Sequence, residues 1–279
     1  MRDEPVTRRT AEDETVKRVD YDRIAPTYDQ RFAVSPMEHA ASLLETMVRD
    51  RAARRVLEVG CGTAHHLADL LPETEQCCGL DYSTGMLHLA QKRERALDLV
   101  RGRARQIPFP DATFELVYCI NAIHHFDDPQ GFIGEGRRLL APEGILVVIG
   151  SDPHDQAGRW YVYDYFAGTL ETDLGRFPSR GTITNWMVTA GFEEVEWRPV
   201  QRILDHRVGR EVLDHSFLRK NACSQLALLS EEAYAAGLRR INEALEEAAE
   251  AGETLLFPVD IRIGAVVGRV PTDSDGARM

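Results

Sequence analysis

Long apolar runs are absent from this 279-residue sequence, and no stretch approaches the ~18 residues that a membrane-spanning helix requires. The N-terminus is charged and has no apolar core, so no secretory signal is expected either. Cysteine is scarce, and the five cysteines form no Cys-x-x-Cys pair, which argues against a disulfide framework. These absences predict a cytoplasmic protein without a membrane partner.

Positive charge is also in short supply, with 33 Lys and Arg against 45 Asp and Glu and a net charge of −12. A protein that binds nucleic-acid backbone needs a basic surface, so DNA and RNA are not expected partners. Part of the acidity is concentrated in residues 243–253, which we interpret as a solvated helix face. The length suffices for one α/β domain with insertions, and the sequence gives no indication of the oligomeric state.

The strongest local pattern is a strand, a glycine turn and a helix in direct succession. Residues 56–59 are apolar apart from Glu58 and predict a buried parallel strand. Gly60 and Gly62 allow a tight turn and close approach of a ligand to the backbone. Residues 63–71 then carry apolar side chains at helical spacing. This order predicts the first unit of a nucleotide-binding α/β fold, with the ligand at the carboxyl end of the strand.

Two acidic residues frame this turn. Asp81 ends a second predicted strand, residues 76–80, and follows Gly62 by 19 residues, near the ~20-residue spacing of a ribose-binding acid. A third glycine, which a dinucleotide site requires, is missing because His65 stands in its place, and there is no P-loop. Glu58 instead suits the cationic end of S-adenosylmethionine (SAM), which carries no phosphate. The alternative is that Glu58 is only a surface charge at a strand end.

Further segments extend the pattern in a fixed order. They are Tyr21-Asp22-Arg23-Ile24-Ala25-Pro26-Thr27-Tyr28-Asp29, Leu57-Glu58-Val59-Gly60-Cys61-Gly62-Thr63, Gly79-Leu80-Asp81-Tyr82-Ser83, Ile107-Pro108-Phe109-Pro110, Phe114-Glu115-Leu116-Val117, Ile123-His124-His125-Phe126 and Leu139-Leu140-Ala141-Pro142-Glu143-Gly144. On these segments the chain resembles the class I SAM-dependent methyltransferases, in particular the group related to the ubiquinone and menaquinone methyltransferases. The resemblance spans about residues 21–150. It implies a Rossmann-like, seven-stranded, mostly parallel sheet with helices on both faces.

We expect a single domain over residues 19–270, with its core at 37–150, between mobile tails at 1–18 and 271–279. Beyond the first two strands, the expected strands are 100–104, 114–120, 145–149, about 194–200 and 259–270, and helices are expected at 37–48, after Ser83, after Asp128 and at 183–190. Two insertions follow the fifth and sixth strands. The first, about 151–180, is rich in aromatic residues, and the second, about 202–255, has helical spacing. Both are predicted to form a lid over the substrate.

The resemblance implies a cofactor site at the carboxyl ends of the strands. The predicted cofactor-binding residues are Tyr28, Glu58, Gly60, Cys61, Gly62, Thr63, Asp81, Tyr82, Met86, Ala104, Arg105, Asn121 and Ala122. Asp81 is expected to bind the ribose hydroxyls, with Tyr82 and Met86 beside the adenine. Relatives commonly place an acid two positions after a glycine to meet the adenine amine, but residues 102–106 here read Gly-Arg-Ala-Arg-Gln. The backbone of Ala104 or a stacked arginine is the expected substitute.

Few obligatory catalytic side chains are expected, because methyl transfer from SAM mainly requires alignment and exclusion of water. A base is needed only if the acceptor must lose a proton. His124 and His125 are the catalytic candidates, and the alternative for each is a structural histidine. His65 and His66 are expected on a helix surface; as neighbours on one helix they point apart, so no metal site is predicted.

The acceptor is expected to contact residues of the N-terminal segment and of the aromatic insertion. The candidates are Tyr21, His125, Trp160, Tyr161 and Tyr165. The alternative is that the aromatic residues of the insertion form a small core of its own. His154, Arg180 and Lys220 are candidate anchors for an acceptor carboxylate.

The sequence therefore predicts transfer of a methyl group from SAM to a small molecule, with S-adenosylhomocysteine (SAH) as product and with oxygen, nitrogen and carbon all open as the acceptor atom. One alternative is a SAM-binding protein of this fold that has lost or changed methyl transfer, for example a cyclisation catalyst or a regulatory partner. A remote alternative is an NAD-dependent oxidoreductase, against which the missing third glycine argues.

Overall fold

The computed structural model describes residues 18–31, 37–155 and 159–272, so most of both predicted tails lies outside the described residues. Seven strands form one sheet in the order β3-β2-β1-β4-β5-β7-β6. The strands are β1 (Arg55–Val59), β2 (Gln76–Asp81), β3 (Asp98–Arg101), β4 (Phe114–Ile120), β5 (Leu140–Ser151), β6 (Glu193–Val208) and β7 (Leu256–Arg269). The first five strands are parallel, β7 is antiparallel to β5, and β6 is antiparallel to β7. The predicted fold class is thereby confirmed.

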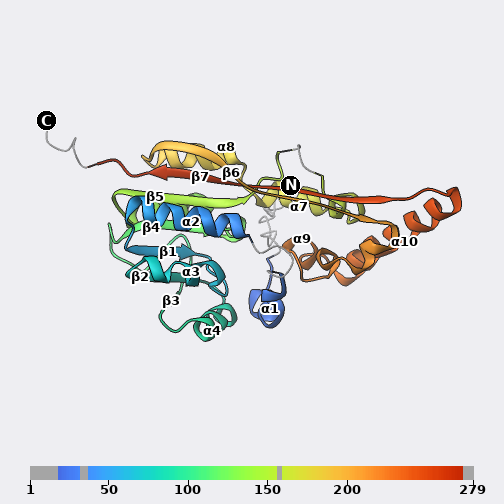
Figure 1. Ribbon diagram of the computed structural model, residues 1–279, viewed down its shortest axis with the longest axis horizontal. Coiled ribbons are helices and arrows are strands. Elements are labelled where there is room, and N and C mark those ends of the chain that lie inside the picture. Colours follow the sequence, from blue (N-terminus) through green and yellow to red (C-terminus); the bar gives the residue numbers. More distant parts are fainter. Residues whose placement is uncertain (1–17, 32–36, 156–158, 273–279) are drawn as a thin grey trace, which may run out of the picture.

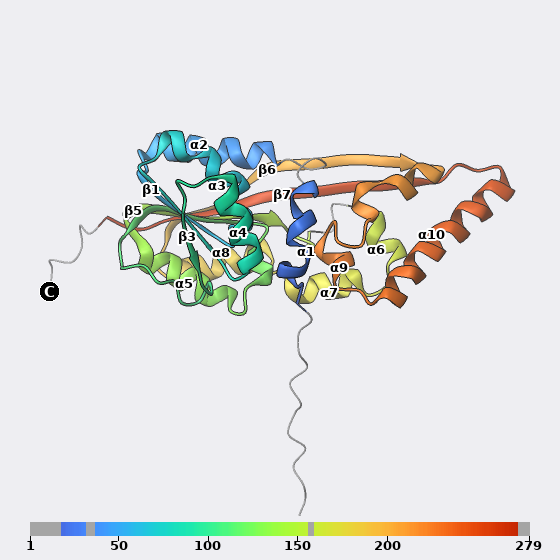
Figure 2. The same cartoon turned by 90° about the horizontal axis from the view of Figure 1, so that it is seen from below.

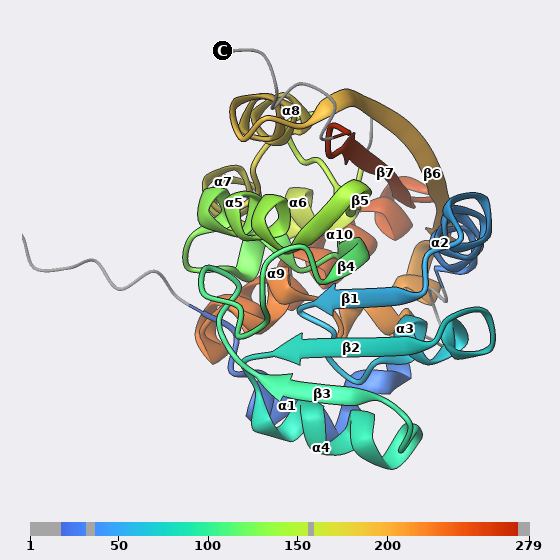
Figure 3. The same cartoon turned by 90° about the vertical axis from the view of Figure 1, so that its left-hand side faces the viewer.

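Helices cover both faces of the sheet, as Figure 3 shows end-on. On one face lie α2 (Glu38–Arg51) and α3 (His65–Asp69), and on the other lie α5 (Pro129–Leu139) and α8 (Arg180–Thr189). Leu44 and Leu67 anchor the first pair in one core cluster, and Phe132 and Met187 anchor the second pair in another. Central strands such as β4 are buried on both faces, which is why they read as continuous apolar runs.

Sequence capping signals place two of the helices next to the site. The Ser83 hydroxyl accepts a hydrogen bond from the backbone N–H of Met86 and starts α4 (Thr84–Arg93). The Asp128 carboxylate accepts one from the backbone N–H of Gly131 and starts α5. Both caps are as predicted.

The chain order reverses between β1 and β4, because β1 pairs with β2 on one side and with β4 on the other. Ligands of open α/β sheets bind outside the carboxyl ends of the strands at such a point. The short helix α1 (Tyr21–Tyr28) lies there, between α4 and the sheet on one side and the C-terminal helices α9 (Ser224–Ala227) and α10 (Glu231–Ala251) on the other, and the 3-10 turn η1 (Asp29–Arg31) continues it (Figure 2).

A second lobe extends from one end of the sheet. Residues 263–269 of β7 pair with β5, whereas residues 256–262 run on beyond it as a two-stranded ribbon with β6 (Figure 1). The helical elements of this lobe are α6 (Tyr161–Tyr165), α7 (Thr169–Arg176), η4 (Gly209–Asp214), η5 (Ser216–Leu218), α9 (Ser224–Ala227) and α10 (Glu231–Ala251). All of these elements except α7 contribute to a separate core cluster that includes Phe166, Ile241 and Phe257.

Some predicted boundaries are wrong. The segment from residue 202, expected to be helical, continues β6 to Val208. Polar side chains at alternate positions of residues 202–208 obscure the two-residue period of a strand. Ile203 packs against the core of the second lobe, and that contact is not visible in the sequence. The third strand begins at Asp98 rather than at residue 100. Within the described residues, no helix combines the length and the apolarity needed to cross a bilayer.

Candidate functional site

The glycine turn after β1 brings the backbone to the switch point. Gly60 and Gly62 have φ angles of +75° and +55°, which favour glycine at both positions. A Cβ atom at Gly60 would lie only 2.6 Å from the Cβ of Ala122, in the loop after β4. There is therefore no room for a side chain at position 60 where the loops after β1 and β4 meet, and both loops present backbone groups to the crevice.

Asp81 is oriented by this turn. One carboxylate oxygen accepts a hydrogen bond of 2.8 Å from the backbone N–H of Gly62, and the other accepts one of 2.8 Å from that of Ser83. Burial raises the pKa of Asp81, and the backbone N–H groups of Ser83, Gly62 and Tyr82 oppose that shift. A carboxylate has about four lone-pair sites, so capacity remains for a hydroxyl donor such as that of a ribose.

Glu58 is buried rather than a surface charge, which excludes the alternative interpretation of this residue. Its side chain is 3% exposed and accepts a hydrogen bond from the Tyr118 hydroxyl at 3.2 Å. Burial is the main reason that its pKa is raised to about 8, and the Asp81 charge adds to the shift. At neutral pH without a ligand the carboxyl group is therefore mostly uncharged, and a cation beside it would favour the carboxylate.

Helix α1 and η1 are fastened over this site at both ends. The Asp22 carboxylate accepts hydrogen bonds of 2.7 Å from the Ser83 hydroxyl and from the backbone N–H of Gly85, and these bonds lower its pKa. At the other end Asp29 accepts a hydrogen bond of 2.6 Å from the Thr63 hydroxyl and forms an ion pair with Arg93. The first turns of α3 and α4 are thus tied to the N-terminal segment.

The side chains of α1 also cover the cofactor candidates. The Tyr28 ring passes over Gly62, 3.7 Å from the position that a Cβ would take there. Met86 is buried against Ile24 and Ala25 of the same helix. Met86 therefore belongs to the packing of the cover, and Cys61 is likewise buried, with a pKa that burial raises well above its usual range.

The predicted adenine end is built around an exposed tyrosine. Tyr82 is 55% exposed, and the Arg103 guanidinium lies 4.5 Å from its ring centroid and donates to its hydroxyl at 3.1 Å. Arg103 and Arg105 both pair with the Asp127 carboxylate at 3.1 Å, while Ala104 between them is buried. Sequence reasoning missed Asp127, because only the folded sheet brings the loop after β4 beside the loop after β3.

The two catalytic candidates lie on η3 (Ile123–His125), directly after β4 and Asn121. A hydrogen bond of 2.6 Å joins Nε2 of His125 to the hydroxyl of Tyr21. The His124 ring stacks on Phe177 with centroids 3.7 Å apart and planes inclined by 13°. The structure therefore holds both imidazoles between α1 and the end of α7.

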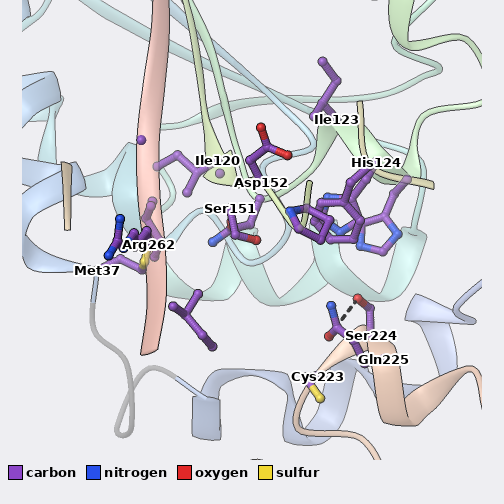
Figure 4. Close-up of a pocket in the computed structure, with 18 of the residues that line it drawn as sticks. Met37, Ile120, Ile123, His124, Ser151, Asp152, Cys223, Ser224, Gln225 and Arg262 are labelled. Atoms are coloured by element: carbon purple, nitrogen blue, oxygen red, sulfur yellow. Dashed lines mark hydrogen bonds between the residues drawn. The ribbon is translucent and has the colours of Figure 1, made fainter. Parts of the chain in front are cut away.

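Tyr28, Glu58 and the two histidines of η3 line one cavity of about 450 Å³ at the carboxyl ends of the strands (Figure 4). The N-terminal segment, β1 and the loops after β1 and β4 contribute Tyr21, Tyr28, Glu58, Gly60, Cys61, Thr63, Asn121, His124 and His125 to its lining. The two insertions contribute Trp160, Tyr163, Leu174, Phe177, Phe217, Ser224 and Gln225. Asp81, Tyr82, Met86 and Arg105 do not line this cavity.

Only one of the three aromatic candidates of the insertion reaches the cavity. Trp160 lines it, whereas Tyr161 is buried with its hydroxyl 3.0 Å from Nδ1 of His215, and Tyr165 packs on Phe257. Tyr161 and Tyr165 belong to the core of the second lobe. Tyr163, which the sequence did not single out, takes their place on the wall.

Of the candidate carboxylate anchors, Arg180 lines the cavity and lies 5.1 Å from the Trp197 ring centroid. His154 instead lies 2.9 Å from the carbonyl oxygen of Phe177, and Lys220 donates to the carbonyl of Leu229. The side chains of His154 and Lys220 therefore contact backbone carbonyl groups and do not line the cavity.

The expectation that His65 and His66 lie on a helix surface is wrong. Both line the cavity, and His66 is buried, which lowers its pKa to about 4. The helix α3 has only five residues and begins at His65, directly after the glycine turn, so that its first two residues lie at the crevice. In the ranges that the structure describes, no group of three or more His, Cys, Asp and Glu side chains is arranged to hold a metal ion.

Comparisons with known proteins agree with this geometry. Residues 57–148 match a family model described as a methyltransferase domain. YcgJ of Bacillus subtilis strain 168, described as an uncharacterized methyltransferase, is 29% identical over 161 residues, which are 54% of this chain and 61% of YcgJ. The demethylmenaquinone methyltransferase of Geobacillus kaustophilus strain HTA426 is 26% identical over 218 residues, 68% of this chain and 93% of that protein.

Solved structures share the fold at low sequence identity. The crystal structure of YcgJ has a TM-score of 0.59 at 18% identity and covers 84% of this chain and 99% of its own. Phosphoethanolamine N-methyltransferase 2 of Haemonchus contortus, solved with SAM, has a TM-score of 0.55 at 16% identity and covers 90% of this chain and 57% of its own.

Proposed function

Since the chain carries a methyltransferase domain on the fold of the SAM-dependent methyltransferases, we propose that it transfers a methyl group from SAM to a small-molecule acceptor. The observation that carries the proposal is the placement of Glu58 and Asp81 on either side of the glycine turn, at the carboxyl ends of β1 and β2. A carboxyl group at or near the end of each of these two strands suits a cation with a ribose better than a diphosphate.

The residues present fit SAM and the role of each follows from its contacts. Asp81, oriented by backbone N–H groups, keeps lone-pair capacity for hydroxyl donors of the ribose. Glu58, whose described hydrogen-bond donor is Tyr118, faces the cavity where the amino group of the methionyl end would be neutralised. Tyr82 with the stacked Arg103 offers a flat surface for the adenine.

When bound, SAM supplies a methyl group already activated by a positively charged sulfur. The chain's own residues then align the acceptor and exclude water. Tyr28 and α1 close one side of the crevice, and the second lobe closes the other. We assign to His125, whose Nε2 lies 2.6 Å from the Tyr21 hydroxyl, the role of accepting a proton from an acceptor hydroxyl or amine.

Titration with SAM and SAH, followed by product analysis with candidate acceptors, tests the proposal. Binding of both compounds with SAM consumed only when an acceptor is present supports it. SAM that is bound but never consumed would favour the alternative of a SAM-binding protein that has left methyl transfer. A titration with NADH tests the alternative of an NAD-dependent oxidoreductase, which the missing third glycine disfavours.

A further inference from the structure

A buried ion pair stands directly behind the far wall of the cavity. Asp173 of α7 is fully buried, the Arg176 side chain is 8% exposed, and Nη2 of Arg176 lies 2.6 Å from Oδ1 of Asp173. Burying such a pair is no cheaper than packing apolar residues in its place. Its presence therefore calls for a role beyond holding α7 in position.

Three residues of the cavity wall take their orientation from this pair. The Tyr163 hydroxyl donates to Oδ2 of Asp173 at 2.8 Å, and Nε2 of Gln225 donates to the same oxygen at 2.5 Å. Arg176 donates to the Ser224 hydroxyl at 3.0 Å. Because a carboxylate only accepts, the amide of Gln225 must turn its nitrogen toward Asp173.

The fixed orientation leaves defined hydrogen-bonding capacity on the cavity side. Gln225 keeps one N–H and lone-pair capacity on Oε1, which the Ser224 hydroxyl approaches only at 3.4 Å. Tyr163 keeps acceptor lone pairs, since its proton is committed to Asp173. Figure 4 labels Ser224, Gln225 and His124 among the side chains that line the cavity.

Aromatic rings adjoin these polar groups. The Trp160 ring centroid lies 5.3 Å from that of Tyr163 and 6.1 Å from that of Phe217, and the Phe177 ring centroid lies 5.2 Å from the Arg176 guanidinium. Leu174 of α7 also lines the cavity. A ligand that reaches from the histidines to Gln225 is therefore enclosed mainly by ring faces and aliphatic carbon.

We propose that Gln225, Ser224 and Tyr163 form a subsite for an uncharged hydroxyl group on a flat, apolar acceptor. A hydroxyl matches a wall that offers one N–H donor and several acceptor oxygens. A carboxylate does not match it, because the charge of Arg176 is already neutralised by Asp173. This inference rests on the proposed function for the name acceptor, and it assigns Asp173 as a positioning residue that acts through Gln225.

Three aromatic probes of one shape test the subsite: 2-naphthol, 2-methylnaphthalene and 2-naphthoate. Their affinities for the full-length protein are measured by equilibrium dialysis, both with saturating SAH and without it. We expect 2-naphthol to bind about fivefold more tightly than 2-methylnaphthalene, the effect of a net hydrogen bond of about 1 kcal/mol. Gln225→Met, which keeps the side-chain length, should reduce this ratio to less than about twofold.

Two further variants control the result. Gln130→Met alters an exposed glutamine on α5 and should leave the ratio unchanged. Asp173→Asn should lower the ratio although position 173 touches no probe, because a side-chain amide there no longer dictates which way the Gln225 amide points. A purely structural Asp173 would weaken all three probes alike and leave their ratio intact. If Gln225→Met fails to fold, Asp173→Asn and Ser224→Ala carry the test.

Equal affinity of the wild-type protein for the two neutral probes, a ratio that survives Gln225→Met, or tightest binding of 2-naphthoate would each overturn the proposal. So would failure of all three probes to bind. Dialysis with SAH alone separates this failure from that of the proposed function, since SAH binding without probe discrimination removes only the subsite. Probe discrimination in a chain that binds no SAH removes only the methyl transfer.

Discussion

The hydroxyl of Tyr21 and Nε2 of His125 lie 2.6 Å apart although 104 residues separate them in the chain. The bond ties α1 to the turn η3 at the cavity. Their rings also meet edge to face, with centroids 5.1 Å apart. The position of α1 and the orientation of the imidazole therefore depend on each other.

Removing the imidazole should slow catalysis without loosening the cofactor. For an acceptor that must lose a proton from oxygen or nitrogen, His125→Ala should lower kcat by about 10²–10⁴-fold, the usual contribution of a general base. Tyr21→Phe keeps the ring but not the hydrogen bond and should cause a smaller loss. Steady-state kinetics and SAM titration on the same samples check this. An unchanged kcat in His125→Ala would assign the histidine a structural role.

The carboxylate of Asp81 should dominate cofactor affinity. Two charge-assisted hydrogen bonds to the ribose, at about 1.5–3 kcal/mol each, predict at least a tenfold rise in Kd for SAM in Asp81→Ala. The matched control is Asp98→Ala, an exposed aspartate at the start of β3 that bonds Gln76. Calorimetric Kd values that are equal in both variants would show that the ribose lies elsewhere.

Cofactor binding should release a proton from Glu58. Its pKa of about 8 keeps the group mostly protonated below that pH, and a bound cation favours the carboxylate. The affinity for SAM should therefore rise with pH between about 6 and 7.5, by up to ~tenfold per unit. Calorimetry in buffers of different ionisation enthalpy counts the proton. Glu58→Gln should bind more weakly and lose the pH slope, whereas a flat wild-type profile would contradict this role.

Two glycines of the second lobe should respond in opposite directions to the same change. A Cβ at Gly237 of α10 would lie 2.2 Å from the Phe166 ring, so Gly237→Ala should lower the free energy of unfolding by about 1–3 kcal/mol. Gly175 of α7 has open space around it, and Gly175→Ala should raise that free energy by about 0.5–1 kcal/mol. Urea titrations of both variants measure the two shifts. Equal shifts would mean that Phe166 does not pack on α10 as described.

Local sequence patterns carried the prediction of the sheet and of its glycine turn. Val56, Leu57 and Val59 read as a buried strand because both of their faces are covered, and Ser83 and Asp128 mark helix starts through their own side chains. These signals depend on residues near one another in sequence. Such local patterns do not depend on how the rest of the chain folds.

Groups brought together from distant segments were less accessible to sequence reasoning. Asp127 reaches Arg103 and Arg105 only because the loops after β3 and β4 meet. The network of Asp173, Arg176 and Gln225 joins two separate insertions, and nothing in either segment alone indicates the other. Ile203 was misassigned for the same reason, since the second lobe that packs against it combines earlier and later residues, among them Trp160 and Phe257.

The most direct measurement is a calorimetric titration of the wild-type chain with SAM, SAH and NADH in turn. The account predicts saturable binding of SAM and SAH at one site per chain, no binding of NADH, and loss of at least ~tenfold in SAM affinity on replacing Asp81. Absence of heat with both SAM and SAH, or saturable binding of NADH alone, would contradict the claim that this glycine turn holds a sulfonium cofactor.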